Sequence, residues 1–230
     1  MSFPAASGTV TKAFDLTLYL VIGPDAVAGR TVEAVAAAAV AGGVTLVQLR
    51  DKTAPDAEVA ALARRLQAVL APRALPLIIN DRIEVARAVG AAGVHLGADD
   101  RPAAEARAAL GPEAIIGVSA GTFEEADLVD PAVVDYVGTG AVYATATKTD
   151  AGAAIGLDGL AALRRRLALP MVAIGGIGLS TAATVAATGV EGIAVVSAVC
   201  AAADPESAAR DLRAAVARGR EEARRRDGAA

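Results

Sequence analysis

The segment LIINDRIEVARAVGAAGVHL, residues 77–96, holds the pattern that decides the fold. Two short apolar runs, 77–80 and 94–96, flank a stretch of helical periodicity over 83–89 that Gly90 ends. Short apolar runs without alternating polar residues are typical of strands that are buried on both faces, as in a parallel sheet. The segment therefore predicts two parallel strands joined by a helix.

The same unit recurs along the chain. Six further strands are predicted at 17–22, 44–49, 115–118, 133–137, 171–174 and 192–196. Helical stretches follow at 31–41, 55–71, 102–110, 123–129, 157–167, 180–188 and from Asp204 onward. Eight strand–helix units in 230 residues predict an α/β fold, a (β/α)8 TIM barrel of eight parallel strands with an outer ring of helices. An open doubly wound sheet is the alternative, but the chain has no G-x-G-x-x-G after the first strand and no Walker A sequence.

A single domain is predicted over residues 1–230, because no linker or low-complexity tract divides the chain. Residues 1–16 are expected to form a flexible extension, and residues 224–230 a frayed end. The amino end lacks the apolar core of a signal peptide, and no stretch reaches about 18 uninterrupted apolar residues. We therefore expect a cytoplasmic protein that makes no membrane contact.

Composition excludes several classes of protein. Apolar residues make up 54% and charged residues 21%, which is typical of a folded globular chain. The net charge of −4 argues against nucleic acid as a partner and leaves a homo-oligomer open. Cys200 is the only cysteine and His95 the only histidine, so an intramolecular disulfide and zinc sites built on several histidines are excluded. We interpret His95 as a buried, hydrogen-bonded residue and Cys200 as part of the core.

Polar residues collect where the predicted strands end, and barrels of this kind carry their active sites at that face. Cations and hydrogen-bond donors dominate there, with two glycines after the seventh strand that can present bare backbone amides to a phosphate. Two carboxylates among so many anion-binding groups are explained if they hold Mg²⁺. Asp81 and Asp100 are the expected ligands, although Asp99 competes with Asp100 and Asp81 could instead cap the following helix. The residues after the strands therefore predict sites for two anionic groups, one bound through metal and cations and one on glycines.

Seven segments of the chain carry a resemblance to a known family: LYLV (18–21), GGVTLVQLRDK (42–52), IINDRIEVARAVGAAGVHLGADD (78–100), IIGVSAGT (115–122), VDYVGTGAVYATATKTDAG (134–152), VAIGGIG (172–178) and GIAVVSAV (192–199). Together they resemble the thiamin-phosphate synthase family. The resemblance implies a transferase that joins hydroxymethylpyrimidine diphosphate to hydroxyethylthiazole phosphate with Mg²⁺ as cofactor. It implies that the pyrimidine diphosphate contacts Gln48, Arg50, Lys52, Asn80, Ser119 and Lys148, and that the metal contacts Asp81 and Asp100. Among these, Arg50, Lys52 and Lys148 would stabilise the departing diphosphate. The thiazole phosphate would contact Thr145, Thr147, Gly176, Val196 and Ser197.

The chain departs from the family pattern at a few positions. Ile22-Gly23 stands where the family usually has Thr-Asp, Gly121 where it has histidine, and Ala141 and Ala144 where it has prolines. Gly121 argues against a related thiazole tautomerase, whose proton transfer is associated with that histidine. The other departures leave a second alternative open, a catalytically silent barrel that binds thiamin phosphate or its precursors.

Overall fold

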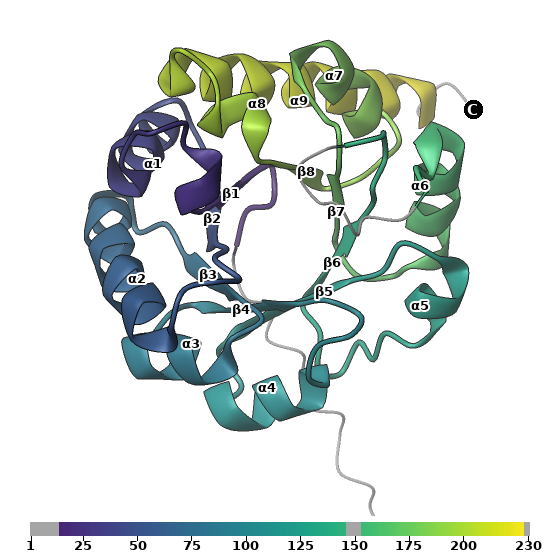
Figure 1. Ribbon diagram of the computed structural model, residues 1–230. Coiled ribbons are helices and arrows are strands. Elements are labelled where there is room, and N and C mark those ends of the chain that lie inside the picture. The colour runs from purple at the N-terminus through teal and green to yellow at the C-terminus, as the bar shows by residue number, and fades with distance from the viewer. Residues whose placement is uncertain (1–13, 146–152, 228–230) are drawn as a thin grey trace, which may run out of the picture.

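Eight short apolar segments form a closed barrel of parallel strands in the computed structural model, which describes residues 14–145 and 153–227 (Figure 1). Each strand pairs with the next along the chain, and the last pairs with the first. The strands are β1 (Leu18–Ile22), β2 (Leu46–Leu49), β3 (Leu77–Asn80), β4 (Gly93–Leu96), β5 (Ile115–Ser119), β6 (Tyr136–Thr139), β7 (Met171–Ile174) and β8 (Gly192–Val195). The predicted (β/α)8 barrel is confirmed.

Helices surround this barrel as an outer ring (Figure 1). They are α1 (Val32–Ala41), α2 (Asp56–Leu70), α3 (Ile83–Val89), α4 (Ala103–Leu110), α5 (Phe123–Asp127), α6 (Gly156–Arg166), α7 (Leu179–Ala186), α8 (Ser197–Cys200) and α9 (Pro205–Asp227), with short 3-10 turns η1 (Pro24–Ala26) and η2 (Ala71–Arg73). No helix in the described ranges is long and apolar enough to cross a membrane.

Local signals in the sequence explain where helices begin and end. Thr122 caps α5 through a capping box with Glu125. Gly90 ends α3 in the left-handed conformation, with a φ of 62° that favours glycine.

The apolar core has two layers. One lies between the strands and the helices and includes Cys200, which is fully buried; this burial raises the pKa of its thiol to about 12. The other fills the barrel itself and contains two fully buried tyrosines, Tyr19 and Tyr136. Glycines make room for ring side chains there: a methyl group at Gly117 would overlap the Tyr136 ring, and one at Gly138 would lie 3.0 Å from Cε1 of His95.

Strand β6 begins three residues later than the sequence predicts. Val133 and Val134 lie in a turn closed by hydrogen bonds from both backbone amides to the Asp130 carbonyl, each 3.1 Å long. The Asp135 carboxylate then binds the Ile116 amide at 2.7 Å and pairs with Arg107, so sheet pairing starts only at Tyr136. Apolar composition alone does not distinguish these valines from strand residues.

The chain ends also differ from the prediction. Leu16 is buried and the ring of Phe14 lies 5.7 Å from that of Tyr136, so residues 14–16 belong to the barrel. Helix α9 continues through Arg224–Arg226, where arginines pair with glutamates one turn earlier in the same helix. Residues 1–13 and 228–230 lie outside the described residues.

A substitution at Gly117 tests the packing inside the barrel. Gly117→Ala is expected to lower the free energy of unfolding by about 1–3 kcal/mol, because the buried Tyr136 ring has no free space to move into. Gly178→Ala is the control, since a methyl group there meets no atom within 4 Å and φ is an ordinary −137°. Denaturant unfolding of the two variants measures the difference, and equal effects would contradict this account of the interior.

Candidate active site

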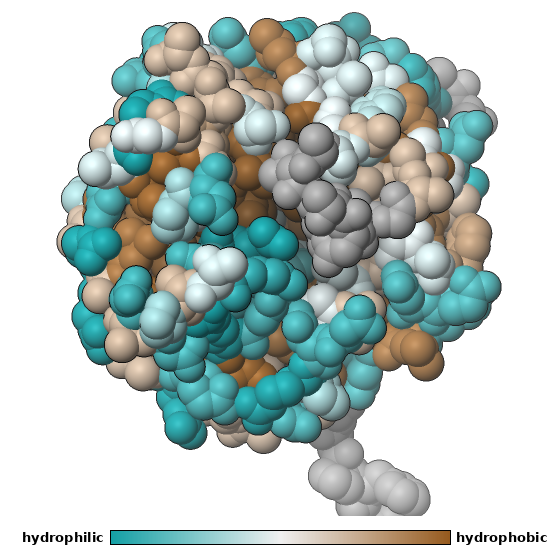
Figure 2. Space-filling model, viewed as in Figure 1, coloured by the Kyte–Doolittle hydropathy of each residue, from teal (hydrophilic) through white to brown (hydrophobic). Residues whose placement is uncertain are grey.

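The carboxyl ends of the strands bring most of the predicted site residues to one face of the barrel. Figure 2, seen from the same side as Figure 1, shows hydrophilic residues gathered near the ends of β2, β3 and β4. The loops that follow these strands carry Arg50, Lys52, Asp81 and Asp100. Asn80 is the last residue of β3 and lies beside His95 of β4 in the sheet register.

Asp81 and Asp100 form a pair of adjoining carboxyl groups. Each affects the acidity of the other, and the Asp81 carboxylate lies 3.4 Å from Nζ of Lys52. Asp81 has a φ of 63°, in the left-handed region, and its amide donates to the His95 carbonyl at 2.9 Å. Asp100 is held by the Gly97 amide, which donates to Oδ2 at 2.6 Å. The backbone therefore fixes both carboxyl groups from separate loops.

The same geometry bears on the alternatives left by the sequence. Helix α3 has Arg82 as its N-cap residue and no side-chain capping hydrogen bond, which argues against a capping role for Asp81. Asp99 is exposed, whereas Asp100 is half-buried and lies against Asp81. Of the two neighbouring aspartates, Asp100 is the one placed to share a ligand with Asp81.

The two carboxyl groups differ in acidity. Burial, the hydrogen bond with Asp100 and the charge of Asp100 together raise the pKa of Asp81 to about 6. Burial opposes ionisation of Asp100 as well, but hydrogen bonds from Asp81 and the Gly97 amide lower the pKa of Asp100 below its ordinary value. The two groups therefore repel each other when both are ionised, and Asp81 is the one that ionises less readily. A divalent cation can offset that repulsion, so the pair fits Mg²⁺, which takes few carboxylates and completes its shell with phosphate oxygens and water.

Among the described residues, no group of three or more histidine, cysteine, aspartate or glutamate side chains could hold a metal. A two-carboxylate site is therefore suited to a metal that arrives with a phosphate-bearing ligand, and not to a metal held by protein side chains alone.

Arg82, which the sequence analysis did not single out, fixes the loop that carries Lys52. Its guanidinium donates to the carbonyls of Ala54 at 2.7 Å and Asp51 at 2.9 Å, and it pairs with Asp56. The Asp51 carboxylate ties the same loop from within by accepting the Ala54 amide at 3.0 Å. The only sequence signal for this role of Arg82 is its place directly after Asp81, which is too weak to have predicted the role.

Gln48 and Ser119 belong to a hydrogen-bonded chain inside the barrel. Gln48 donates to the Tyr19 hydroxyl at 2.7 Å, and the Tyr19 and Tyr136 hydroxyls are 2.8 Å apart. His95 then links Tyr136 at 3.0 Å through Nδ1 and Ser119 at 3.1 Å through Nε2. The interpretation of His95 as hydrogen-bonded is confirmed, but the residue is half-buried, not fully buried as expected. Sequence analysis missed both tyrosines, because they lie in apolar runs.

The glycines after β7 lie against the loop that follows β6. Gly175 and Gly176 have φ values of 99° and 65°, and a methyl group on Gly176 would lie 2.8 Å from the Ala144 carbonyl oxygen. Thr145 ends the described part of that loop, and Thr147 and Lys148 lie outside the described residues.

After β8, Val196 is the N-cap residue of α8, and Ser197 is its first residue. Sequence analysis expected no helix here, yet a short extra helix after the eighth strand is a frequent part of phosphate sites in such barrels.

Two departures from the family pattern lie beside these loops. A side chain at Gly23 would overlap the Arg50 carbonyl oxygen, so the backbone of the Arg50 loop approaches this glycine closely. The Gly121 amide donates to Glu125 at 2.6 Å, and a methyl group there would lie 2.8 Å from the Gly140 carbonyl oxygen. In this conformation both positions are filled by neighbouring backbone.

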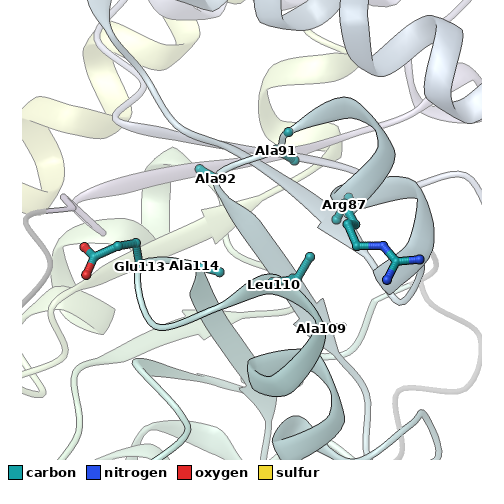
Figure 3. A pocket seen from close by; sticks show the side chains of 9 residues that line it. Arg87, Ala91, Ala92, Ala109, Leu110, Glu113 and Ala114 are labelled. Atoms are coloured by element: carbon teal, nitrogen blue, oxygen red, sulfur yellow. The ribbon is translucent and has the colours of Figure 1, made fainter.

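A separate pocket of about 300 Å³ lies between the ends of α3 and α4, near the amino ends of β4 and β5 (Figure 3). Alanines line most of it, with Arg87, Leu110 and Glu113. None of the predicted site residues borders this pocket, and its walls offer little chemistry.

Comparison with known proteins points to one family. A family model described as thiamine monophosphate synthase matches residues 18–199. The chain is 55% identical over 200 residues to a thiamine-phosphate synthase from Azorhizobium caulinodans, covering 87% of this chain and 94% of that protein. It is 53% identical over 205 residues to one from Xanthobacter autotrophicus, covering 89% and 97%.

Solved structures show the same likeness. A thiamine phosphate pyrophosphorylase from Pyrococcus furiosus superposes with a TM-score of 0.80 at 36% identity, covering 89% of this chain and 96% of that chain. A 3-hexulose-6-phosphate synthase superposes with a TM-score of 0.65 at 20% identity, covering 87% and 99%. This second likeness is one of fold alone.

The acidity of the carboxylate pair gives a stability test in metal-free buffer. Folding raises the pKa of Asp81 to about 6 from an unfolded value of about 3.9, so the folded protein binds the proton more tightly. Stability therefore falls as the pH rises through the interval between these two values. Asp81→Asn removes this cost and is expected to raise the free energy of unfolding by about 1–2 kcal/mol at pH 8, allowing for solvent screening.

Denaturant unfolding with a chelator at about pH 8 and about pH 4 measures this effect, which should vanish at the lower pH. Asp99→Asn is the control, because Asp99 is exposed. If Asp81→Asn had the same small effect at both pH values, folding would not raise the pKa of Asp81 as described.

Proposed function

Since the chain belongs to the thiamine monophosphate synthase family, we propose that it joins hydroxymethylpyrimidine diphosphate to hydroxyethylthiazole phosphate, releasing diphosphate and forming thiamin phosphate. Its relatives carry the name of an enzyme, and the chain is a transferase of thiamine biosynthesis. The observation that carries the proposal of substrates is the Asp81–Asp100 pair with Lys52 beside it, at the strand ends where barrels place their chemistry.

The pyrimidine diphosphate is assigned to the half of the face formed by β2 to β5. Arg50 and Lys52 supply positive charge there, and Asn80 and Ser119 supply neutral donors. The hydrogen bonds of Arg82 hold the loop backbone on both sides of Lys52 before any ligand arrives, so less ordering of this loop is required on binding.

Asp81 and Asp100 would hold Mg²⁺ through their carboxylates. When bound, the metal neutralises negative charge on the diphosphate oxygens and makes that group a better leaving group. The raised pKa of Asp81 beside Asp100 supports this assignment, since a metal ion and a proton compete for the same carboxylate oxygens.

Positively charged side chains of the protein also stabilise the negative charge of the departing diphosphate. Breaking the carbon–oxygen bond leaves positive charge on the electron-rich aminopyrimidine and negative charge on the diphosphate. Arg50, Lys52 and Lys148 are assigned to that growing negative charge. One well-placed donor of this kind is commonly worth around 3 kcal/mol of barrier.

The thiazole phosphate is assigned to the opposite half of the face. Gly176 and the start of α8 at Val196 and Ser197 offer backbone amides, with Thr145 and Thr147 from the loop after β6. The thiazole nitrogen that attacks the pyrimidine carbon carries no proton, so the reaction requires no general base. The hydrogen-bonded position of His95 is consistent with such a site.

The direct test is turnover of purified protein with the two substrates and Mg²⁺, followed by the release of diphosphate. Formation of thiamin phosphate is the expected result. A protein that binds thiamin phosphate or its precursors without turning them over would instead be the silent barrel.

Removal of one carboxylate tests the metal site. Asp100→Ala is expected to raise the Mg²⁺ concentration needed for half-maximal rate by about tenfold or more, because a single carboxylate remains. Titration of Mg²⁺ at saturating substrates measures this, with Asp99→Ala as the matched control. An unchanged Mg²⁺ requirement in Asp100→Ala would remove Asp100 from the site.

Substitutions at Lys148 test the charge assigned to the loop after β6. Lys148→Ala is expected to lower kcat by about a hundredfold, with a stability change under about 0.5 kcal/mol. Lys148→Arg should recover only part of the rate, because a guanidinium differs in shape and reach from an ammonium group. Steady-state kinetics with Lys12→Ala as the control distinguish the two effects; wild-type turnover by Lys148→Ala would remove this loop from the diphosphate site.

A further inference from the structure

The hydrogen-bonded chain from Gln48 to Ser119 crosses the inside of the barrel. It begins on β2, passes through Tyr19 of β1 and Tyr136 of β6, and returns through His95 of β4 to Ser119 of β5. Its two ends are residues assigned above to the pyrimidine diphosphate. The residues between them have no part in the proposed chemistry.

The two tyrosines in the middle of this hydrogen-bonded chain are buried away from solvent. Tyr19 is 1% exposed and Tyr136 is fully buried, and burial raises the pKa of both phenols, so each keeps its hydroxyl hydrogen. Packing holds the Tyr136 ring in place: the Tyr19 ring lies edge-on at 5.9 Å, and the His95 ring lies 5.5 Å away. The missing side chain at Gly117 leaves the space that the Tyr136 ring occupies.

Counting donors and acceptors shows which partner donates in each hydrogen bond between Gln48 and Ser119. A phenol has one hydrogen to donate, and a buried hydroxyl hydrogen without an acceptor is costly. Tyr19 accepts from the Gln48 amide, so its own hydrogen is directed to the Tyr136 oxygen. Tyr136 in turn directs its hydrogen to Nδ1 of His95.

This order determines the tautomer of His95. A ring nitrogen that accepts a hydrogen bond carries no proton, so the proton of the neutral imidazole lies on Nε2 and points to Ser119. Ser119 then accepts from His95 and keeps its own hydrogen for another partner. An anion can only accept hydrogen bonds, so a diphosphate is the kind of partner that this arrangement suits.

We propose that Tyr136 is a positioning residue that holds His95 as the Nε2-protonated tautomer and thereby makes the Ser119 hydroxyl a donor to the bound diphosphate. The reverse order would turn the oxygen lone pairs of Ser119 toward the anion and leave the Tyr19 hydrogen without an acceptor in the chain. The identity of the anion rests on the proposed function, whereas the order of the hydrogen bonds does not.

Nitrogen NMR reads this order directly. Because His95 is the only histidine, selective ¹⁵N-histidine labelling gives one pair of ring signals with no assignment problem. We expect free wild-type protein at about pH 8, above the usual range of histidine, to show a protonated Nε2 and an unprotonated Nδ1. A protonated Nδ1, a mixture of tautomers or a doubly protonated ring would overturn the proposal without any substitution.

Two tyrosine variants separate the links. Tyr136→Phe removes the donor to Nδ1 and is expected to give a mixture of tautomers, whereas Tyr19→Phe leaves that donor in place and should keep the wild-type tautomer. Thr45→Val is the matched control, since Thr45 is another buried hydroxyl, hydrogen-bonded to the Leu18 backbone carbonyl at 3.1 Å and not to any of these five residues. An unchanged tautomer in Tyr136→Phe would overturn the proposal; should that variant fail to fold, the wild-type spectrum and Tyr19→Phe still test it.

Calorimetric titration with inorganic diphosphate and Mg²⁺ tests the consequence for binding. Tyr136→Phe and Ser119→Ala are each expected to weaken binding about tenfold or more, and the double variant should add little, because both act through one hydroxyl. Thr45→Val should bind like wild type, which separates positioning from general loss of stability. Wild-type affinity in Tyr136→Phe would overturn the positioning role.

These outcomes are distinguishable from failure of the proposed function. Absence of turnover with the two substrates would contradict that function, yet the tautomer and the affinity for diphosphate would still be measurable. Where turnover is present, Tyr136→Phe should raise KM for the pyrimidine diphosphate and leave KM for the thiazole phosphate unchanged.

Discussion

The pairing of β8 with β1 is the contact on which the rest of the structure depends. Leu18 lies beside Ile193 in this pairing, and Gly192 allows the backbone at Leu16 to approach closely. Closure of the sheet puts all eight carboxyl ends on one rim and encloses a packed interior. Residues far apart in the sequence, such as Gln48 and Ser119, can then be joined by side chains that cross the barrel.

The fold was predictable because its signals are local. Each strand is a short apolar run; Gly90 ends a helix through its left-handed backbone, and Thr122 begins one through its side chain. The sixth strand was misplaced because Asp135 takes its partners from β5 and α4, a contact that a window of neighbouring residues does not contain. The four-residue α8 is too short for any periodicity and depends on the backbone turn at Val196.

The site was predictable only in part, because residue type and position after a strand do not specify neighbours in space. These signals found Asp81, and the structure places Asp100 and not Asp99 beside it. Tyr19 and Tyr136 lie among apolar strand residues, and only the register of the closed sheet shows that both rings point inward and meet. Arg82 serves the site through backbone carbonyls, which any sequence supplies, so no pairing of residue types predicts its role.

The placement of Arg82 couples two segments mechanically. The guanidinium holds the loop after β2, while the same residue is joined by one peptide bond to Asp81, whose backbone lies in the left-handed region. A single side chain therefore joins the loop that carries Lys52 to the backbone beside Asp81, so a substitution at Arg82 would remove contacts of both segments at once.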